Sequence, residues 1–255
     1  MAKVVWAIET FLNNCLFFIV IVLGGLMQNS YFKKVLFFVL FSIIVLIAGR
    51  INFSQLVGST AQYLTFFQFI GPIAGAFLGP VIGIASVFFA ELMDFAIAGK
   101  SIELLNILRL LPMLFATFYF AFFLKKSNFS KASVAIPIAC IALFILHPVG
   151  REAWYYSLFW AIPLIAKVFS KRLFLRSLGA TFTAHAIGSV IFAWTVPMTA
   201  EQWTMLIPIT ATERIAFAIG ISISFIAFNN LLNFVEAKAK TGFLHVEKNY
   251  LLQKA

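Results

Sequence analysis

Residues 70–83 read IGPIAGAFLGPVIG, and this short stretch governs the fold that we expect for the whole chain. Glycine recurs at every fourth position, 71, 75, 79 and 83, and a proline follows two of these glycines. Proline in a helix interior removes a backbone hydrogen bond and clashes with the preceding turn. We therefore expect the chain to reverse direction at Gly79-Pro80, while Gly71 and Gly75 let the preceding helix pack closely against a neighbour.

The composition around this stretch is that of a helical membrane protein. The chain has 255 residues, of which 62% are hydrophobic and 11% charged, whereas a soluble domain has about 25% charged residues. Continuously apolar runs of roughly membrane-spanning length recur along the sequence, which favours helices over the alternating strands of a barrel. We expect spans at about 11–27, 35–49, 106–124, 132–148, 153–169, 175–197 and 205–230.

The stretch 63–97 needs separate treatment because it is too long for one span. A straight helix of this length would measure about 52 Å, but the hydrocarbon core of a bilayer is about 30 Å thick. A helical hairpin with limbs at about 63–78 and 81–97 removes the excess. We therefore predict an all-α, polytopic integral membrane bundle of about 7–9 membrane segments. Residues 1–235 form a single transmembrane domain, and residues 236–255 form a cytoplasmic basic tail.

The distribution of basic residues predicts the orientation of the bundle in the cell membrane. Lys and Arg concentrate in the cytoplasmic loops of multi-pass proteins. The predicted loops and tail on one side contain 13 of them, and those on the other side contain four. This split requires 63–97 to cross an even number of times, and both two crossings and one re-entrant dip satisfy it. The N-terminus is then outside and the C-terminus in the cytoplasm. The net charge of +10 then reflects this bias and attraction to the lipid bilayer, and we expect no nucleic-acid partner.

Aromatic residues agree with this orientation. Trp and Tyr favour the membrane–water interface, where the ring is apolar and its polar atom reaches water. Five of them lie near the loops predicted to be outside, and we expect an interfacial belt made of Trp154, Tyr155, Tyr156, Trp194 and Trp203.

Ionisable side chains inside apolar spans are costly and are functional candidates by default. Glu91 and Asp94 are three residues apart, so they share one helix face in the second limb of the hairpin. Most of the other candidates also fall in the outer half of the predicted bundle, which suits a pocket that opens outward and is closed below by packed Phe and Leu. We predict a substrate-binding site made of Glu91, Asp94, Arg109, His147, Arg151, Glu152, His185, Glu213 and Arg214.

Purely structural roles remain open for the same residues. Arg109 can form an ion pair with Glu91 or Asp94 that holds three helices together. Glu213 and Arg214 are adjacent on a helix, so their side chains point about 100° apart and cannot both face one partner directly. The remaining candidates can end a helix, form a solvated pair in a loop or make an ordinary contact between helices.

Several chemistries have no support in the sequence. No glycine-rich loop followed by Lys-Ser/Thr is present, so we expect no ATP hydrolysis by this chain. The zinc motif HExxH and the nucleophile motif GxSxG are also missing, and Cys15 and Cys140 both lie inside apolar runs. We expect neither a metal nor a cofactor, and enzymatic activity is the less favoured interpretation.

The stretch FIGPIAGAFLGPVIGIASVFFAELMDF, residues 69–95, resembles the second and third helices of S components, the substrate-binding membrane subunits of energy-coupling-factor transporters. Shared features are the glycines and prolines that open a short helix pair and the acidic residues toward its outer end. The resemblance implies capture of a small-molecule solute from outside, and it implies a transmembrane coupling subunit and two cytoplasmic ATPases as partners.

The first expectation is therefore a membrane transport protein that binds a small solute on the outer side for uptake with separate energising subunits. One alternative is an intramembrane hydrolase or transferase that uses His147, Arg151, Glu152 and His185 for acid–base work and oxyanion stabilisation. A second alternative is a non-catalytic membrane scaffold or assembly subunit. A binding protein needs its polar residues to converge on a cavity of about 300 Å³ or more, whereas a scaffold pairs them off.

Overall fold

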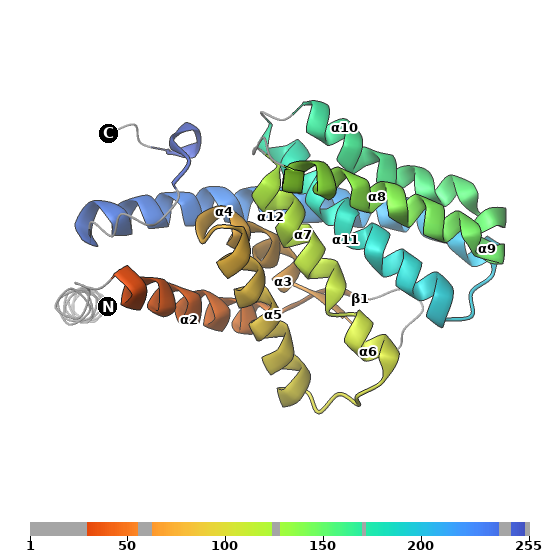
Figure 1. Cartoon of the computed structure of the whole chain (residues 1–255), viewed down its shortest axis with the longest axis horizontal. Helices are drawn as coiled ribbons and strands as arrows, with labels where there is room; N and C mark the ends of the chain where they lie inside the picture. The colour runs from red at the N-terminus through yellow and green to blue at the C-terminus, as the bar shows by residue number, and fades with distance from the viewer. Residues whose placement is uncertain (1–29, 56–62, 124–127, 170–171, 240–245, 253–255) are drawn as a thin grey trace, which may run out of the picture.

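The fold is helical, with one pair of short strands near the first third of the chain (Figure 1). The helical segments are α2 (Ser30–Ala48), α3 (Phe67–Ile70), η1 (Gly71–Ile73), α4 (Ala74–Phe77), α5 (Pro80–Ile97), α6 (Leu104–Leu108), α7 (Leu111–Phe122), α8 (Asn128–Leu146), α9 (Pro148–Glu152), η2 (Trp154–Ala161), α10 (Ile162–Val168), α11 (Leu173–Thr195), α12 (Ala200–Ala239) and η3 (Lys248–Tyr250). The computed structural model describes residues 30–55, 63–123, 128–169, 172–239 and 246–252.

Within the described residues, five helices are long and apolar enough to cross a membrane. They are Pro80–Ile97, Leu104–Phe122, Phe129–Leu146, Leu173–Thr195 and Ala200–Ala237. Two shorter apolar helices, Val35–Ala48 and Phe67–Phe77, accompany them. The helical fold class predicted from the sequence is therefore confirmed, and the predicted span at 11–27 lies outside the described residues.

The chain reverses direction at Gly79, as the glycine–proline pattern predicts. Gly79 has φ +79° and ψ 163°, a backbone conformation that is essentially restricted to glycine. Pro80 then occupies the first turn of α5, where its missing N–H has no partner to lose. A Cβ on Gly83 would lie 2.5 Å from the Cα of Gly75, so these two glycines allow α4 and α5 to pack backbone against backbone.

The first limb of this hairpin differs from the prediction. Residues 63–65 are not helical but form β2 (Tyr63–Thr65), which pairs antiparallel with β1 (Asn52–Gln55). Aromatic and β-branched residues favour strands, which is consistent with this change. The helical part begins at Phe67 and is divided into α3, η1 and α4, with Pro72 in the first turn of η1.

The predicted span at 153–169 also has a different internal structure. It begins after the short helix α9 and consists of the 3₁₀-helix η2 followed by α10. Tyr156 and Trp160 of η2 are buried, and both ring systems contact the buried ring of Phe144 on α8. The 3₁₀ segment therefore supplies part of the core.

The expected aromatic belt is only partly correct. Trp154 and Trp194 are exposed, but Tyr156 and Trp203 are buried and pack against each other with ring centroids 5.0 Å apart. Proximity to a loop in the sequence does not separate an interfacial ring from a core ring, because η2 and the start of α12 fold inward.

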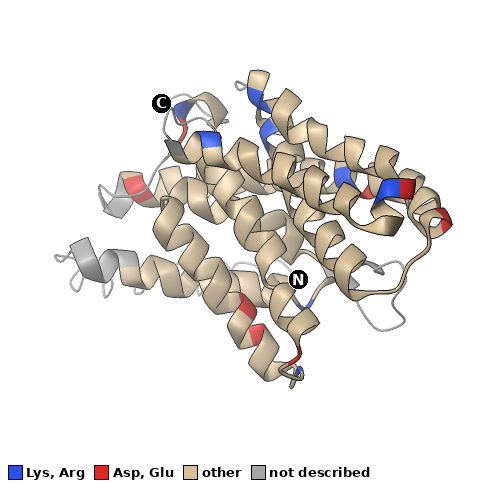
Figure 2. Cartoon of the chain, turned by 45° about the vertical axis from the view of Figure 1, so that its right-hand side comes forward, with Lys and Arg blue, Asp and Glu red and all other residues tan. Residues whose placement is uncertain are grey.

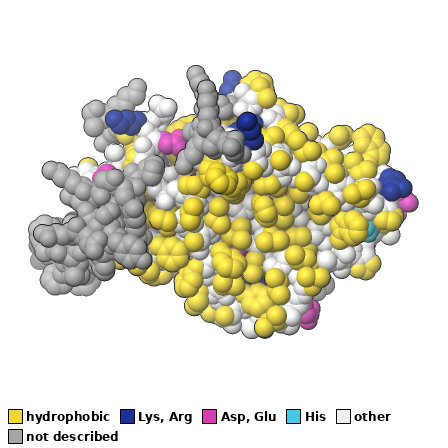
Figure 3. Space-filling view, viewed as in Figure 1, with side chains coloured by type: hydrophobic (Ala, Val, Ile, Leu, Met, Phe, Trp, Pro, Cys, Tyr) yellow, Lys and Arg dark blue, Asp and Glu magenta, His cyan; other side chains and the backbone are white. Residues whose placement is uncertain are grey.

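Helix α11 lies at the centre of the bundle and packs against α7, α8, α10 and α12. Its Gly179 faces the ring of Tyr119, whose hydroxyl donates a 2.6 Å hydrogen bond to the Pro163 carbonyl of α10. This contact ties three helices at the core. In Figure 3 hydrophobic side chains cover most of the visible face, and charged side chains lie toward the margins of the described surface.

Candidate functional site

A cavity of about 610 Å³ lies where the C-terminal ends of α2 and α5 meet the strand pair and the start of α6–α7. We call it the first cavity. In Figure 2 acidic positions appear in red in the C-terminal half of α5. The charged and amide-bearing side chains that line the first cavity are Arg50, Asn52, Gln68, Glu91, Asp94, Lys100, Asn106 and Arg109.

Asp94 is paired within the first cavity. Its carboxylate oxygens lie 3.1 Å from Arg50 and 3.0 Å from Lys100. All three side chains are between about a third and a half exposed, so these ion pairs contribute little to stability. They matter more for the charges that the cavity presents to a ligand. Because Arg50 and Lys100 already pair with Asp94, these three side chains are engaged with one another.

Glu91 and Arg109 are not paired in this way. Among the described residues, the buried Oε2 of Glu91 and the buried Nε of Arg109 have no hydrogen-bond partner. The Arg109 guanidinium lies 5.3 Å from the ring centroid of Phe192, which is cation–π distance. Among the described residues, Arg109 therefore forms no ion pair with Glu91 or Asp94, the structural role considered above.

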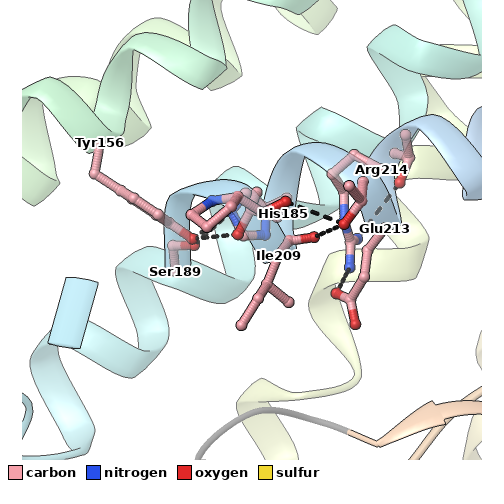
Figure 4. A network of polar contacts seen from close by, with 10 residues as sticks. Tyr156, His185, Ser189, Ile209, Glu213 and Arg214 are labelled. Carbon is pink, nitrogen blue, oxygen red and sulfur yellow. Dashed lines mark hydrogen bonds and ion pairs between the residues drawn. The ribbon is translucent and has the colours of Figure 1, made fainter. Parts of the chain in front are cut away.

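A second cavity, of about 230 Å³, lies between α11, α12 and η2. Its polar lining includes Tyr156, His185, Ser189, Thr210, Glu213 and Arg214, which Figure 4 shows in part. The rest of its lining is mainly apolar and aromatic, as binding sites for small organic molecules usually are.

Tyr156 holds the polar side chains of the second cavity together. Its hydroxyl lies 3.0 Å from Nε2 of His185 and 2.8 Å from the hydroxyl of Thr210. Nε2 of His185 is also 3.4 Å from the hydroxyl of Ser189 (Figure 4). Two hydroxyl groups thereby hold the His185 ring, that of Tyr156 on η2 and that of Ser189 on α11 itself.

Arg214 and Glu213 interact with each other although they are neighbours in sequence. A terminal nitrogen of Arg214 lies 3.5 Å from Oε2 of Glu213, and the other donates a long 3.4 Å hydrogen bond to Thr181. The guanidinium carbon is 4.5 Å from the ring centroid of Phe217. Arg214 is only 7% exposed, so it is a buried cation whose contacts among the described residues include a carboxylate, a hydroxyl and a ring.

The two cavities adjoin each other. Arg109 and Gln68 line both of them, so one side chain contacts the space on either side. Six of the nine predicted site residues consequently gather around this pair of cavities. Glu91 and Asp94 line the first, His185, Glu213 and Arg214 line the second, and Arg109 lies between them.

The other three predicted site residues lie elsewhere. His147 precedes α9, and its ring packs against Trp194 with centroids 5.2 Å apart. Arg151 and Glu152 are exposed on α9. None of the three lines either cavity, and no described contact joins them to His185.

Several lining residues were not predicted. Arg50 and Lys100 are assigned to loops by the sequence, yet each follows an apolar helix and turns toward Asp94. Gln68 and Asn106 carry no charge and stand out less in an apolar sequence. Tyr156 and Trp203 are expected in the interfacial belt, but η2 and the start of α12 place their rings in the core.

A further buried cation lies at the other end of the bundle, near the C-terminal segment 246–252. Nε of Arg176 donates a 2.9 Å hydrogen bond to the Phe120 carbonyl, and Nη1 lies 2.7 Å from Oε1 of Glu247. Burial of the Tyr250 hydroxyl raises its pKa. These contacts place part of the predicted tail against the bundle.

Comparison with known proteins gives one relative of limited similarity. The chain is 27% identical over 182 residues to the uncharacterized protein MJ0923 of Methanocaldococcus jannaschii. The alignment covers 65% of this chain and spans about 60% of the relative's length. No family model matches the sequence, and no solved structure is significantly similar to it.

Proposed function

We propose that this chain is a multi-pass protein of the cell membrane. The support comes from the five helices, in the part of the chain that the structure describes, that are long and apolar enough to span a bilayer. It also comes from large apolar side chains on the surface, such as Val81, Ile102 and Val168, which are 79%, 85% and 78% exposed. Soluble monomers rarely expose extended apolar surface, whereas lipid covers it favourably.

The proposed orientation has the N-terminus outside and the C-terminus in the cytoplasm. If α2, α3–α4, α5, α6–α7, α8, η2–α10, α11 and α12 each cross once, the C-terminal ends of α2, α5, α8 and α11 fall on the outer side. Lys167, Arg172 and Arg176 then lie toward the cytoplasmic side, in agreement with the positive-inside rule. The first cavity, formed by the ends of α2 and α5, opens toward the outside in this arrangement.

The proposed activity is binding of a small solute from the outer side for uptake. One observation supports it most: charged and amide side chains surround a cavity of about 610 Å³, within the range that holds metabolites. A scaffold would pair such groups off, but Glu91 and Arg109 each keep a buried polar atom without a partner among the described residues. Unsatisfied buried groups are costly, so a bound solute that satisfies them gains affinity.

Energy for uptake would come from other subunits. The sequence has no nucleotide-binding loop of its own, and residues 69–95 resemble S components. On this proposal a transmembrane coupling subunit and two ATPases join the chain during transport. Purification of the tagged protein from its native membrane tests this part, because such ATPases should copurify with it.

Solute binding is tested by the thermal stability of the purified protein in detergent with a panel of vitamins and metabolites. We expect at least one compound to raise the melting temperature by several degrees, because a ligand that binds only the folded state stabilises it. Glu91→Ala and Arg109→Ala should abolish this shift.

The matched controls are Glu152→Ala and Arg151→Ala, which remove the same charges from α9. Both residues are exposed and line neither cavity, so the shift should persist in these variants. A panel in which no compound stabilises the wild-type protein would contradict the proposal, as would equal loss of the shift in all four variants.

An intramembrane enzyme is the second candidate, because His185 lies 3.0 Å from the Tyr156 hydroxyl and faces the second cavity. It has less support, since the nearby serine hydroxyl is 3.4 Å away and the other proposed groups lie on α9 or directly before it, outside both cavities. An enzyme and a binding protein differ in the fate of the stabilising compound. An enzyme converts the stabilising compound during incubation, whereas a binding protein returns it unchanged, as mass spectrometry of the incubated compound would show.

A further inference from the structure

The charged side chains of the first cavity that form no ion pair among the described residues, Glu91 and Arg109, indicate the chemical class of its ligand. We infer that the two adjoining cavities take a zwitterionic small molecule with an apolar body. Its anionic group meets Arg109, its ammonium group meets Glu91, and its apolar part enters the second cavity. This inference rests on the proposed function, because it names the class of solute that the same site binds.

The first step is the charge balance of the first cavity. Five ionisable side chains line it, and three of them form one cluster in which Asp94 lies 3.1 Å from Arg50 and 3.0 Å from Lys100. The remaining two, Glu91 and Arg109, have opposite signs and form no ion pair among the described residues. The cavity therefore offers one carboxylate and one guanidinium to whatever enters it.

The second step concerns the hydrogen bonds of these two groups. Oε2 of Glu91 is a buried acceptor without a donor, and Nε of Arg109 is a buried donor without an acceptor, among the residues described. A purely anionic ligand would satisfy Arg109 and be repelled by Glu91, and a purely cationic ligand would do the reverse. A ligand with both an ammonium and an anionic group satisfies both, and charge-assisted hydrogen bonds are the stronger kind.

The third step places the apolar part of the ligand. Arg109 lines both cavities, and its guanidinium lies 5.3 Å from the ring of Phe192, which also lines the second cavity. Beyond this ring the second cavity is bordered by Met198, Trp203 and Leu206. An anionic group held at Arg109 therefore directs the rest of the molecule toward an aromatic and aliphatic pocket, where burial of apolar surface adds affinity.

The experiment begins with a compound library divided in advance into zwitterions, anions, cations and neutral molecules. Each class contains members with and without an aromatic or branched aliphatic body. Thermal stability of the purified wild-type protein identifies the compounds that bind. We expect the stabilising compounds to be zwitterions with an apolar body, and small zwitterions without one, such as glycine, to have a much weaker effect.

The second part measures the affinity of the best zwitterion and of two analogues, one lacking the amine and one lacking the anionic group. Glu91→Gln should weaken zwitterion binding at least about tenfold, the loss expected when a charge-assisted hydrogen bond is removed. It should change binding of the amine-free analogue less than about twofold. Arg109→Gln should show the opposite selectivity. Glu152→Gln and Arg151→Gln are the matched controls and should behave as wild type.

The outcomes separate the two proposals. If only singly charged or neutral compounds stabilise the protein, solute binding stands and the zwitterion inference is overturned. The inference also fails if Glu91→Gln weakens the amine-free analogue as much as the zwitterion, because Glu91 then does not contact the ammonium group. If no compound in any class binds, the proposed function fails and the inference fails with it.

Discussion

Arg109 is the residue on which the two cavities depend. It lines both, lies over the Phe192 ring and keeps one buried N–H without a partner among the described residues. Glu91 is its counterpart of opposite charge on α5, likewise with an unsatisfied buried atom. A fold that needed these groups only for packing would gain stability by pairing them. Their arrangement is better explained by a ligand that pairs with both.

Gly83 should not tolerate a side chain. Its added Cβ would lie 2.5 Å from the backbone of Gly75, and backbone cannot move aside cheaply. We expect Gly83→Ala to destabilise the purified protein by about 1–3 kcal/mol, as overpacking does. Gly188→Ala is the control, because the nearest atom to its added Cβ is 3.9 Å away. Equal melting temperatures for the two variants would contradict close packing of α4 on α5.

The Tyr156 hydroxyl should matter more than that of its neighbour Tyr155. Tyr156→Phe leaves His185 and Thr210 without their 3.0 and 2.8 Å partner in the core. We expect a loss of about 1–3 kcal/mol in stability, together with weaker solute binding. Tyr155 contacts Thr204 near the surface, so Tyr155→Phe should change the melting temperature little. A larger loss in Tyr155→Phe than in Tyr156→Phe would argue against the buried network.

Among the elements, the long helix α12 has a second role beyond crossing the bundle. Asn229 near its C-terminal end exchanges two hydrogen bonds with the backbone of Glu247, at 2.9 and 2.8 Å. Asn230 does the same with the Tyr250 carbonyl and the Leu252 N–H, at 3.0 and 2.8 Å. Two consecutive side chains thus bind the C-terminal segment 246–252, which brings Glu247 to the buried Arg176.

The ion pair between Arg176 and Glu247 predicts that the C-terminal segment stabilises the bundle. Glu247→Ala leaves the buried Arg176 guanidinium without its carboxylate, and we expect a loss of about 1–3 kcal/mol in stability. Lys248→Ala alters the adjacent, exposed residue and should have almost no effect. The melting temperatures of the two purified variants provide the comparison, and an unchanged value for Glu247→Ala would show that the segment does not stabilise the bundle.

The elements could be predicted from the sequence to different degrees. The reversal at Gly79 was predictable because only glycine adopts that conformation readily and Pro80 begins a helix well. The strand β2 was not, because three residues at the edge of an apolar run show no periodicity of their own. The 3₁₀ character of η2 was not predictable either, since it depends on packing against Phe144 rather than on local sequence.

At the scale of the whole molecule, a second group of aromatic rings, apart from those that line the second cavity, lies next to the C-terminal segment. Phe77 and Phe120 both pack on the ring of Phe225, with centroids 5.1 and 5.7 Å away. Phe225 in turn contacts Tyr250 of the C-terminal segment. In the orientation that we propose, these packed rings lie toward the cytoplasmic end of the bundle, next to the C-terminal segment.

The candidate site was partly predictable for a related reason. Charged residues inside apolar helices are conspicuous, and Glu91, Arg109 and Arg214 were found by that signal alone. Whether a charged side chain at a helix end points inward depends on tertiary structure. The sequence therefore does not place Arg50 and Lys100 in the site, although they line the first cavity, and it does place Arg151 there, although Arg151 lines neither cavity. Neutral lining residues such as Gln68 give no comparable signal in the sequence.

The orientation and the solute site can be tested together by cysteine labelling of intact cells. In a background without Cys15 and Cys140, Ser101→Cys introduces a thiol into the lining of the first cavity. Asn249→Cys introduces one at an exposed position of the C-terminal segment. A membrane-impermeant maleimide distinguishes the two sides.

The most direct single measurement is the rate of Ser101→Cys labelling with and without the compound that stabilises the protein. We expect labelling from outside, slowed at least about tenfold by a saturating ligand that covers the site, while Asn249→Cys reacts only after permeabilisation. Labelling of Asn249→Cys but not Ser101→Cys in intact cells would contradict the orientation. A labelling rate of Ser101→Cys that the compound leaves unchanged would contradict binding in the first cavity.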